Sequence, residues 1–553
     1  MTREFLPNTN AHLMNCWELD REALIAFKNG LNDPANRLSS WKGSNFDLRD
    51  PHQDGFQFFG SGAIPQTFGN LSSLQYLDLD NSLTLEWQLG LYVDNLDWVT
   101  GLVSLKHLDM DAVDLSNVGS HWIMKLNKLS SLTELHLSDC SLSGPIPPLT
   151  FVNLTSLVVL DLMSNELNSK IPDWLFLYLG HNDLTASCHQ LLGGRWEKIQ
   201  ELDLESISLH GKLPASTGNM TFLTFLNLFS NNVKGGIPSF IGKLFNLVYF
   251  DIGKNNLTGT LPEFLEGIEN CLSRRPLPSL QVLHLPNNHL VGKSPECLTQ
   301  LANLVELDLS SGNSLCGPIP ASFGILQQNV TYLNLNEDEL NGTLPESLGQ
   351  LSKLSFLDVS SNRLTGIVTE THFLNLEKLR VLDLSSNSFT LAVNSNWVPP
   401  FQVETLHMDS CHMGPSFPAW LKSQKRLTDL NLSNTSISGS IPHWFWEHFL
   451  NLSTLNVSNN HLEGHLRSHL NYAPTLDIGT VASFDLSSNN FSGASPILSG
   501  NFWIIDLSKN KFSSTTPNDI SFSNYLKFLF ISDNQISGEI PPSIGKNYWY
   551  LSY

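Results

Sequence analysis

The sequence predicts an α/β repeat solenoid in which short parallel strands form a β-sheet along the concave face. First, a pattern of the form L-x-L-x-x-N, with conservative apolar replacements, recurs nineteen times. Second, successive copies are mostly 24 or 25 residues apart, which is the length of one small structural unit. Third, 41% of the 553 residues are hydrophobic and 15% are charged, so the chain can bury a continuous core.

Each repeat is expected to contribute one strand to this sheet. In Leu160-Asp161-Leu162 the two leucines lie on one side of a strand and the aspartate on the other. Leu382-Asp383-Leu384 shows the same alternation. A single strand cannot bury its apolar side alone, so we expect the repeats to stack into a parallel sheet over residues 61–553.

The last position of the pattern, here called the asparagine slot, is expected to stabilise the turn that leaves each strand. A side chain in this slot can bond backbone groups that the turn would otherwise bury unpaired. Cys140 and Cys411 occupy the slot in two repeats, so both are predicted to be structural. The slot falls at positions 82, 113, 140, 165, 182, 207, 231, 255, 288, 313, 338, 362, 387, 411, 435, 460, 489, 510 and 534.

Nine repeats continue after the slot with G-x-I-P or G-x-L-P. These segments are 62–65, 144–147, 211–214, 235–238, 259–262, 317–320, 342–345, 439–442 and 538–541. Glycine permits backbone angles that are closed to other residues, and proline fixes φ and removes a donor. We therefore expect the first part of this second segment to be extended.

The complete unit, L-x-x-L-x-x-L-x-L-x-x-N-x-L-x-G-x-I-P, resembles the plant-type leucine-rich repeat. The run of such units from about Ser61 to Pro541 is similar to the ectodomains of plant receptor-like proteins and receptor-like kinases. The resemblance implies a leucine-rich-repeat superhelix.

Residues 1–60 contain a segment that resembles the N-terminal cap of plant-type repeats. An apolar stripe at helical spacing, Leu19, Ala23, Leu24, Phe27 and Leu31, is followed by Leu38-Ser39-Ser40-Trp41. The family cap continues with a cysteine-rich segment, whereas residues 42–59 contain no cysteine. The cap is therefore expected to be incomplete, with Cys16 lacking a local partner.

Several departures from a regular array are expected. The slots at 165 and 182 are only 17 residues apart, and an insertion near 264–279 separates those at 255 and 288. The N-terminus lacks the apolar run of a signal peptide, and no stretch reaches the roughly 18 apolar residues of a membrane helix. The chain ends at Tyr553 without a C-terminal cap, which predicts a portion of a longer receptor-like protein.

Composition and motifs argue against catalysis and against nucleic-acid binding. The formal charge is −21 and Lys and Arg do not cluster, unlike in proteins that bind phosphates. No Walker loop, G-x-S-x-G elbow or kinase signature is present, so we predict neither an enzyme nor a cofactor. Seven cysteines without C-x-x-C spacing do not indicate a disulfide or zinc framework.

Histidines spaced four residues apart are candidate metal ligands. His461, His465 and His469 would share a face of a helix, but they follow the slot at Asn460 and are expected to be extended. His407, Cys411 and His412 lie at another repeat corner and are also interpreted as structural. No metal site is predicted.

Aromatic residues at outward strand positions are the candidate ligand contacts, because exposed aromatic clusters on a rigid surface are typical anchors. The first group is Phe225, Phe229 and Tyr249 with Asn227 and Asp251, and the second is Tyr332 with Phe356. Between the paired apolar residues the outward position is Asp in ten repeats, Asn in four and His in three. This column is interpreted first as a feature of the repeat and second as a binding stripe for a basic or hydroxyl-rich ligand.

Eleven N-x-S/T sequons fit a glycosylated, secreted surface. They are Asn70, Asn153, Asn219, Asn256, Asn329, Asn341, Asn431, Asn434, Asn451, Asn456 and Asn490. Asn431 and Asn456 fall in the outward column, so glycans on both would keep a ligand away from those two repeats.

The predicted function is non-enzymatic recognition of an extracellular peptide, protein or glycan, in defence or development. The resemblance implies a place on the extracellular face of the plasma membrane, through a membrane segment absent from this chain, and a co-receptor kinase as partner. One alternative is an inhibitor resembling the plant leucine-rich proteins that block polygalacturonases. Another is a nonfunctional truncated receptor product.

Overall fold

The computed structural model describes residues 62–552 with internal gaps. The gaps are 65, 82–89, 147–152, 158, 169–178, 183, 194–198, 262–276, 294–297, 299–300, 327, 449–451, 467–468, 473–481, 501, 514–525 and 538–549. The chain forms two compact units, Met1–Lys234 and Gly235–Tyr553. The cap-like region predicted at 1–60 and most of the insertion predicted near 264–279 lie outside the described residues.

The first unit contains parallel strands of three residues each. Strands β2 (Tyr76–Asp78), β4 (His107–Asp109), β5 (Glu134–His136) and β7 (Val159–Asp161) pair in that order, and β9 (Glu201–Asp203) pairs with β11 (Phe225–Asn227). The central leucines of neighbouring strands are in register, as Leu108 and Leu135 show, and both are fully buried. The row of inward leucines is the core that the alternation predicts.

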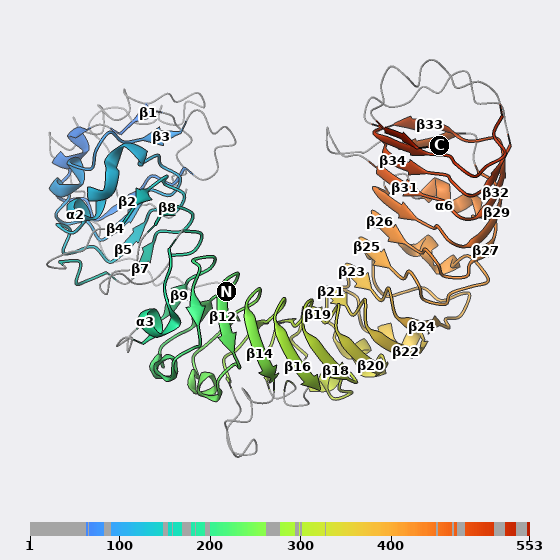
Figure 1. The fold of residues 1–553 in the computed structure, drawn as a ribbon, viewed down its shortest axis with the longest axis horizontal. Helices are drawn as coiled ribbons and strands as arrows, with labels where there is room; N and C mark the ends of the chain where they lie inside the picture. Colours follow the sequence, from blue (N-terminus) through green and yellow to red (C-terminus); the bar gives the residue numbers. More distant parts are fainter. Residues whose placement is uncertain are drawn as a thin grey trace, which may run out of the picture. The chain divides into compact units, whose positions relative to one another are not determined.

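The second unit repeats this arrangement over a longer sheet, drawn from green to red in Figure 1. Its strands pair in sequence order as β13 (Tyr249–Asp251), β15 (Val282–His284), β17 (Glu306–Asp308), β19 (Tyr332–Asn334), β21 (Phe356–Asp358), β23 (Val381–Asp383), β25 (Thr405–His407), β26 (Asp429–Asn431), β28 (Thr454–Asn456), β31 (Ala482–Asp485), β34 (Phe502–Asp506), β36 (Phe528–Phe530) and β37 (Tyr550–Ser552). Within this unit the sheet lies on the inner side of the arc (Figure 1), so the fold class predicted from the repeats is confirmed.

The segments after the slots form a second set of parallel strands. In the first unit these are β6 (Ser143–Gly144), β8 (Glu166–Leu167) and β10 (His210–Gly211), with β12 (Asn232–Gly235) at its end. In the second unit they are β14 (Asn256–Thr260), β16 (His289–Lys293), β18 (Ser314–Gly317), β20 (Glu339–Thr343), β22 (Arg363–Val368), β24 (Ser388–Leu391), β27 (Ser438–Gly439), β29 (His461–His465), β32 (Asn490–Gly493) and β35 (Lys511–Phe512). The predicted extended conformation is therefore confirmed. Gly342, for example, has a φ of 84°, an angle that disfavours any residue with a Cβ atom.

Short helices follow these strands in many of the described repeats. In the first unit they are η2 (Gln66–Asn70), η3 (Trp98–Gly101), η4 (Ser116–His121), α2 (Trp122–Leu126), α3 (Cys188–Leu192) and η5 (Ala215–Asn219). In the second they are η6 (Ser239–Lys243), α5 (Phe323–Leu326), η8 (Glu346–Gln350), η9 (Glu370–Phe373), η10 (Ala419–Ser423) and α6 (His443–His448). Two small sheets, β1 (Gly62–Ala63) with β3 (Leu91–Tyr92) and β30 (His469–Tyr472) with β33 (Ile497–Gly500), lie beside the main ones.

The asparagine slots form a hydrogen-bonded ladder through the interior. The Asn165 side chain accepts from the backbone N–H of Cys140 at 3.2 Å and of Leu142 at 2.9 Å, and its Nδ2 donates to the Leu137 carbonyl at 2.8 Å. The same Nδ2 also donates to carbonyls of its own repeat. The asparagine thus bonds the backbone of its turn, as predicted, and in addition connects two consecutive repeats. The same pattern is found at Asn182, Asn231, Asn288, Asn313, Asn362, Asn387, Asn460, Asn489, Asn510 and Asn534.

Other residues in the slot reproduce the ladder only in part. The buried Cys140 donates its Sγ–H to the Met110 carbonyl at 3.0 Å, and Cys411 donates to Leu384 at 3.4 Å. Both thiols are free, and burial raises the pKa of Cys411 to about 12, so the predicted structural role of the two cysteines is confirmed.

In one slot the side chain is a carboxylate, that of Asp338. Its Oδ1 accepts from the Leu315 N–H at 3.0 Å, but its buried Oδ2 has no partner. Burial raises the pKa of Asp338 from 3.8 to about 7. A carboxylate also has no N–H that it could donate to the carbonyls around the slot.

Removing one ladder asparagine should destabilise the fold. Asn387→Ala loses the bond accepted from Leu364 N–H and three bonds donated to carbonyls, which leaves buried backbone groups unpaired. We expect a loss of about 2–4 kcal/mol in the free energy of unfolding, measured by urea titration. The exposed neighbour Ser388 serves as control, since Ser388→Ala should change stability by less than about 0.5 kcal/mol. Equal stability of the two variants would contradict a structural role for the ladder.

Asp338→Asn should stabilise the protein in a pH-dependent manner. The folded-state pKa of about 7 exceeds the ordinary value of 3.8, so the wild-type carboxyl destabilises the fold increasingly as pH rises from about 4 to 7. The variant should therefore gain little at pH 4 and up to about 4 kcal/mol at pH 8, measured by urea titration at both values. The reverse change at the next slot, Asn362→Asp, should destabilise more at pH 8 than at pH 4. A pH-independent difference would refute the assigned pKa shift.

Candidate functional site

The column of Asp and Asn at outward strand positions first serves the fold. Asp358 Oδ1 accepts from the N–H of Ser360 at 2.8 Å, and Asn456 Oδ1 accepts from Ser458 at 3.0 Å. The same bond to the N–H two residues later is made by Asp78, Asp109, Asp161, Asp203, Asn227, Asp251, Asp308, Asn334, Asp383, Asn431, Asp485 and Asp506. These side chains cap the backbone where each strand ends. The interpretation of this column as a feature of the repeat is therefore the one the contacts favour.

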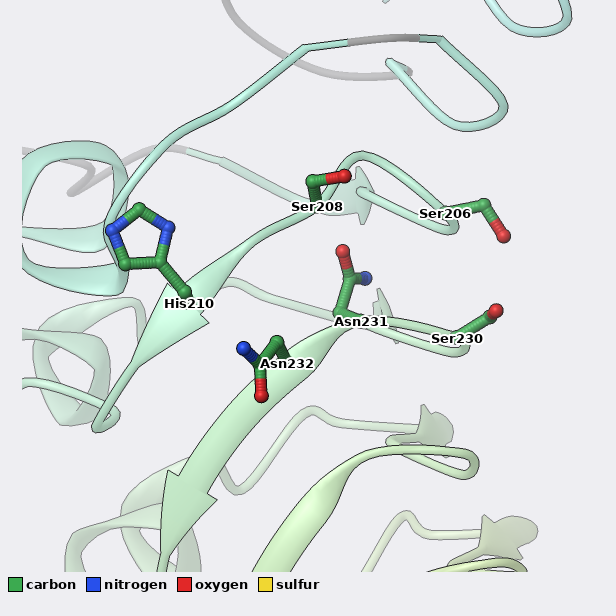
Figure 2. Close-up of a pocket in the computed structure, with 6 residues that line it drawn as sticks. All are labelled: Ser206, Ser208, His210, Ser230, Asn231 and Asn232. Carbon is green, nitrogen blue, oxygen red and sulfur yellow. The ribbon is translucent and has the colours of Figure 1, made fainter.

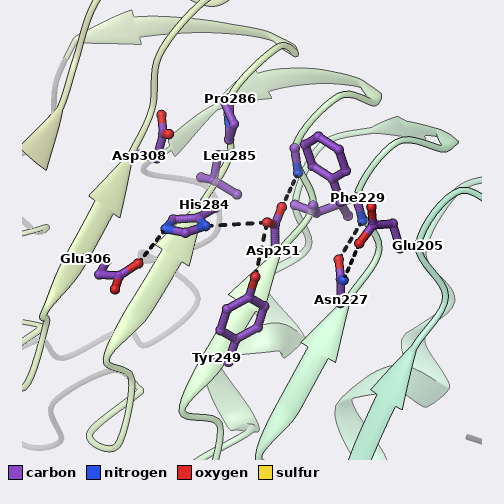
Figure 3. Close-up of polar contacts among 12 residues, drawn as sticks. Glu205, Asn227, Phe229, Tyr249, Asp251, His284, Leu285, Pro286, Glu306 and Asp308 are labelled. Carbon is purple, nitrogen blue, oxygen red and sulfur yellow. Dashed lines mark hydrogen bonds and ion pairs between the residues drawn. The ribbon is translucent and has the colours of Figure 1, made fainter. Parts of the chain in front are cut away.

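The first predicted aromatic group divides between the two units. Phe225 and Asn227 lie on β11 of the first unit, and Phe229 follows this strand. Asn227 is only 6% exposed, and its Nδ2 donates to Glu205 Oε2 at 3.0 Å while its Oδ1 accepts from the Phe229 N–H (Figure 3). Its polar groups are thus engaged within the protein, although the sequence suggested a ligand contact.

In the second unit, Tyr249 and Asp251 join a network that continues to the next two strands (Figure 3). The Tyr249 hydroxyl donates to Asp251 Oδ2 at 3.4 Å. His284 lies between two carboxylates, with Nδ1 3.4 Å from Asp251 and Nε2 3.3 Å from Glu306. Burial acts to lower the pKa of His284, but the contact with Asp251 and the nearby carboxylates raise it above its ordinary value.

The second predicted pair is brought together by the register of β19 and β21. The rings of Tyr332 and Phe356 stack with centroids 4.3 Å apart and an interplanar angle of 16°. The Tyr332 hydroxyl lies 3.5 Å from Asp308 Oδ2, and burial together with this carboxylate raises its pKa to about 12. Tyr332 therefore remains a neutral hydrogen-bonding group at physiological pH.

These residues form one strip on the main sheet of the second unit. We call it the aromatic-acidic strip, and it consists of Tyr249, Asp251, His284, Glu306, Asp308, Tyr332 and Phe356. Sequence reasoning missed His284, Glu306 and Asp308. The sequence does contain a signal for these three residues, because they occupy outward positions on the strands between the two predicted aromatic groups.

A shallow polar hollow of about 430 Å³ lies in the first unit (Figure 2). It is lined by Ser206, Ser208, His210, Ser230, Asn231 and Asn232. Asn231 already belongs to the asparagine ladder, and no aromatic side chain lines the hollow. Its position between neighbouring repeat turns explains these residues without a ligand.

The histidines weighed as metal ligands adopt the extended arrangement predicted for them. His461 and His465 lie on strand β29, and His465 Nδ1 is 2.9 Å from the Ser492 carbonyl. His407 lies between Asp383 at 3.0 Å and Asp429 at 3.2 Å, and these contacts raise its pKa to about 10. It is therefore a charged bridge between strands at neutral pH.

The described sequons differ in accessibility. Asn70, Asn219, Asn256, Asn341 and Asn434 are exposed, whereas Asn153, Asn329, Asn431, Asn456 and Asn490 are partly buried. Asn451 lies outside the described residues. Asn431 Nδ2, the atom a glycan would modify, donates to Asp409 at 2.8 Å. Glycosylation at all eleven positions stays a prediction.

Comparison with protein families identifies the repeat unit. The leucine rich repeat model matches residues 131–152, 222–244, 246–268, 279–301, 303–326, 426–448 and 525–547. The leucine rich repeat N-terminal domain model matches residues 18–47, which overlaps the segment that resembles a cap. Within the described part of the chain, no helix is long and apolar enough to cross a membrane.

Similar curated proteins include two tomato receptors. Receptor-like protein EIX2 from Solanum lycopersicum is 32% identical over 95% of this chain and 60% of its own length. Receptor-like protein EIX1 from the same species is 34% identical over 80% of this chain and 44% of its own length. The chain thus spans about half the length of these relatives. Both relatives are receptor-like proteins by name, which is consistent with the prediction of a chain that is not an enzyme.

Solved structures share the solenoid. The plant peptide hormone receptor RGFR1 in complex with RGF2 superposes with a TM-score of 0.61 at 22% identity, covering 87% of this chain and 82% of that one. The Arabidopsis receptor kinase HAESA, in complex with the peptide hormone IDA and the co-receptor SERK1, gives 0.58 at 25% identity, covering 96% and 97%. The chain therefore contains leucine-rich repeats, and its curated relatives are plant receptor-like proteins.

Proposed function

We propose that the chain recognises an extracellular peptide through the aromatic-acidic strip of its second unit. The observation that carries the proposal is the stacked pair Tyr332 and Phe356, which presents rigid, partly exposed aromatic area beside carboxylates. Aromatic side chains with hydrogen-bonding neighbours are the usual anchors of a binding surface. Because these side chains point away from the core, they can contact a ligand without a change of fold.

The charge of the strip favours a peptide with basic side chains. Glu306, whose side chain is 41% exposed, and Asp308 lie between the Tyr249 and Tyr332 strands. His284 neutralises part of this charge, but the strip retains more carboxylates than cations. A lysine or arginine of a peptide would meet carboxylates here and could also lie over an aromatic ring.

The comparisons support a peptide more directly than a protein or a glycan. RGFR1 and HAESA are both described in complexes with peptide hormones, and the HAESA complex includes a co-receptor. By analogy we propose that a co-receptor kinase supplies the phosphotransfer for which this chain has no motif. By the same analogy we propose that the chain lies on the extracellular face of the plasma membrane.

The proposed site is compatible with the predicted glycans. The strip occupies β13 to β21, whereas the sequons in the outward column, Asn431 and Asn456, lie on β26 and β28. Strands β23 and β25 separate the two regions in the sheet order. Glycans at those asparagines would therefore leave the strip accessible.

The experiment uses the purified chain and a phage-displayed random peptide library. We expect enrichment of peptides that contain Lys or Arg next to an apolar residue. The double variant Tyr332→Ala, Phe356→Ala should weaken the binding of an enriched synthetic peptide by about 10- to 100-fold, or roughly 1.4–2.8 kcal/mol, as measured by calorimetry. Circular dichroism should be unchanged, because both side chains lie outside the leucine core.

Phe245→Ala is the matched control, since Phe245 is 41% exposed and lies outside the strip. It should bind the peptide as the wild type does. Equal binding by the double variant would place recognition elsewhere. Failure to enrich any peptide, together with inhibition of a fungal polygalacturonase, would instead support the inhibitor alternative.

A further inference from the structure

The first unit carries a cluster of metal-ligating side chains that sequence analysis did not single out. Strands β4 and β5 pair with His107 opposite Glu134 and Asp109 opposite His136. Alternate residues of a strand lie on one face, and paired strands are about 4.8 Å apart, so these four side chains form a square on the face opposite the leucine core. The cluster belongs wholly to the first unit and is separate from the aromatic-acidic strip.

We propose that His107, Glu134 and His136 bind a zinc ion. One ligand atom from each residue lies within 4.8 Å of the others. Ligand atoms around tetrahedral zinc are about 3.3 Å apart, since Zn–N and Zn–O bonds are about 2.0–2.1 Å long. Small side-chain rotations therefore complete the site. Two imidazoles and one carboxylate are a donor set that zinc prefers, and three protein ligands leave a position open to solvent.

The donor atoms are held in place but are not fully used by the protein. Tyr76 stacks on the His107 ring at a centroid distance of 4.1 Å and an interplanar angle of 5°. His107 Nδ1 is 2.7 Å from Glu134 Oε2, but its buried Nε2 has no hydrogen-bond partner. Among the described residues, the ring of His136 makes no hydrogen bond. The Glu134 side chain, 46% exposed, is free to turn toward an ion.

A second triplet, Asp109, Asp111 and His136, also brings its ligand atoms within 4.8 Å. Its carboxylates are already used, because Asp109 Oδ1 accepts from the Asp111 N–H and Asp111 Oδ1 accepts from the Ser138 N–H at 2.7 Å. The structure therefore assigns the ion to the triplet with two imidazoles.

The test uses the purified chain and zinc chloride alone, with binding measured by calorimetry and bound metal counted after dialysis. We expect one zinc ion per chain. His136→Asn and Glu134→Gln should each weaken binding by at least about tenfold, since even indirect partners of a metal contribute that much. Asp111→Asn keeps its carbonyl oxygen for Ser138 and should stay within about threefold of the wild type. His289→Asn is the matched control, because it removes an exposed histidine of the other unit that belongs to neither proposed site.

The outcomes separate the proposal from its alternatives. X-ray absorption of the zinc-loaded chain should show two imidazole ligands, and this measurement decides the matter if a variant fails to fold. Unfolding temperature should rise with zinc in the wild type and in His289→Asn, but not in His136→Asn. Absence of bound zinc in the wild type would overturn the proposal. So would tight binding by Glu134→Gln, or loss of binding in Asp111→Asn alone.

Discussion

The hydrogen bonds of the asparagine ladder are the interaction on which the repeat fold depends. The residue before each slot turns into the left-handed region, as Ser386 does at a φ of 52° and Asn459 at 54°, and the adjacent backbone groups become buried. A side-chain amide can hydrogen-bond these backbone groups, because its oxygen accepts from N–H groups of one repeat and its nitrogen donates to carbonyls of two repeats. Strands of three residues make few bonds of their own. The ladder therefore fixes the spacing at which every outward side chain is presented.

This constraint divides the outward positions into two kinds. The second outward residue of most strands, such as Asp358 or Asn456, caps the backbone that enters the turn. The first outward residue makes no such capping hydrogen bond, so its identity is free to vary between repeats. Tyr332, Phe356 and His107 all occupy first positions, and the two candidate sites both depend on them. The proposed strip thus combines first positions, which folding leaves unassigned, with capping residues such as Asp251 and Asp308.

The fold could be predicted from the sequence because the repeat period and the slot each have one physical explanation. The inward leucines, the extended G-x-I-P segments and the roles of Cys140 and Cys411 followed from local pattern alone. The candidate sites could be predicted only in part. The stack of Tyr332 on Phe356 follows from strand register, whereas the bridge at His284 depends on how side chains of three strands rotate toward each other. The hydrogen bonds of Asn227 likewise depend on another repeat, because its partners Asp203 and Glu205 lie there.

The two bridging histidines show how the sheet tolerates a row of like charges. Outward carboxylates on neighbouring strands repel each other, and burial makes this repulsion stronger than in water. His284 and His407 each lie on a strand between two carboxylate-bearing strands and contact both, Asp251 with Glu306 in one case and Asp383 with Asp429 in the other. At His407, whose pKa is raised to about 10, a proton on the imidazole offsets part of this repulsion, and the pKa of His284 is raised in the same direction. A ligand with positive charge, as proposed for the aromatic-acidic strip, would gain from the carboxylates that remain unbalanced, so the electrostatics of the fold would also favour that ligand.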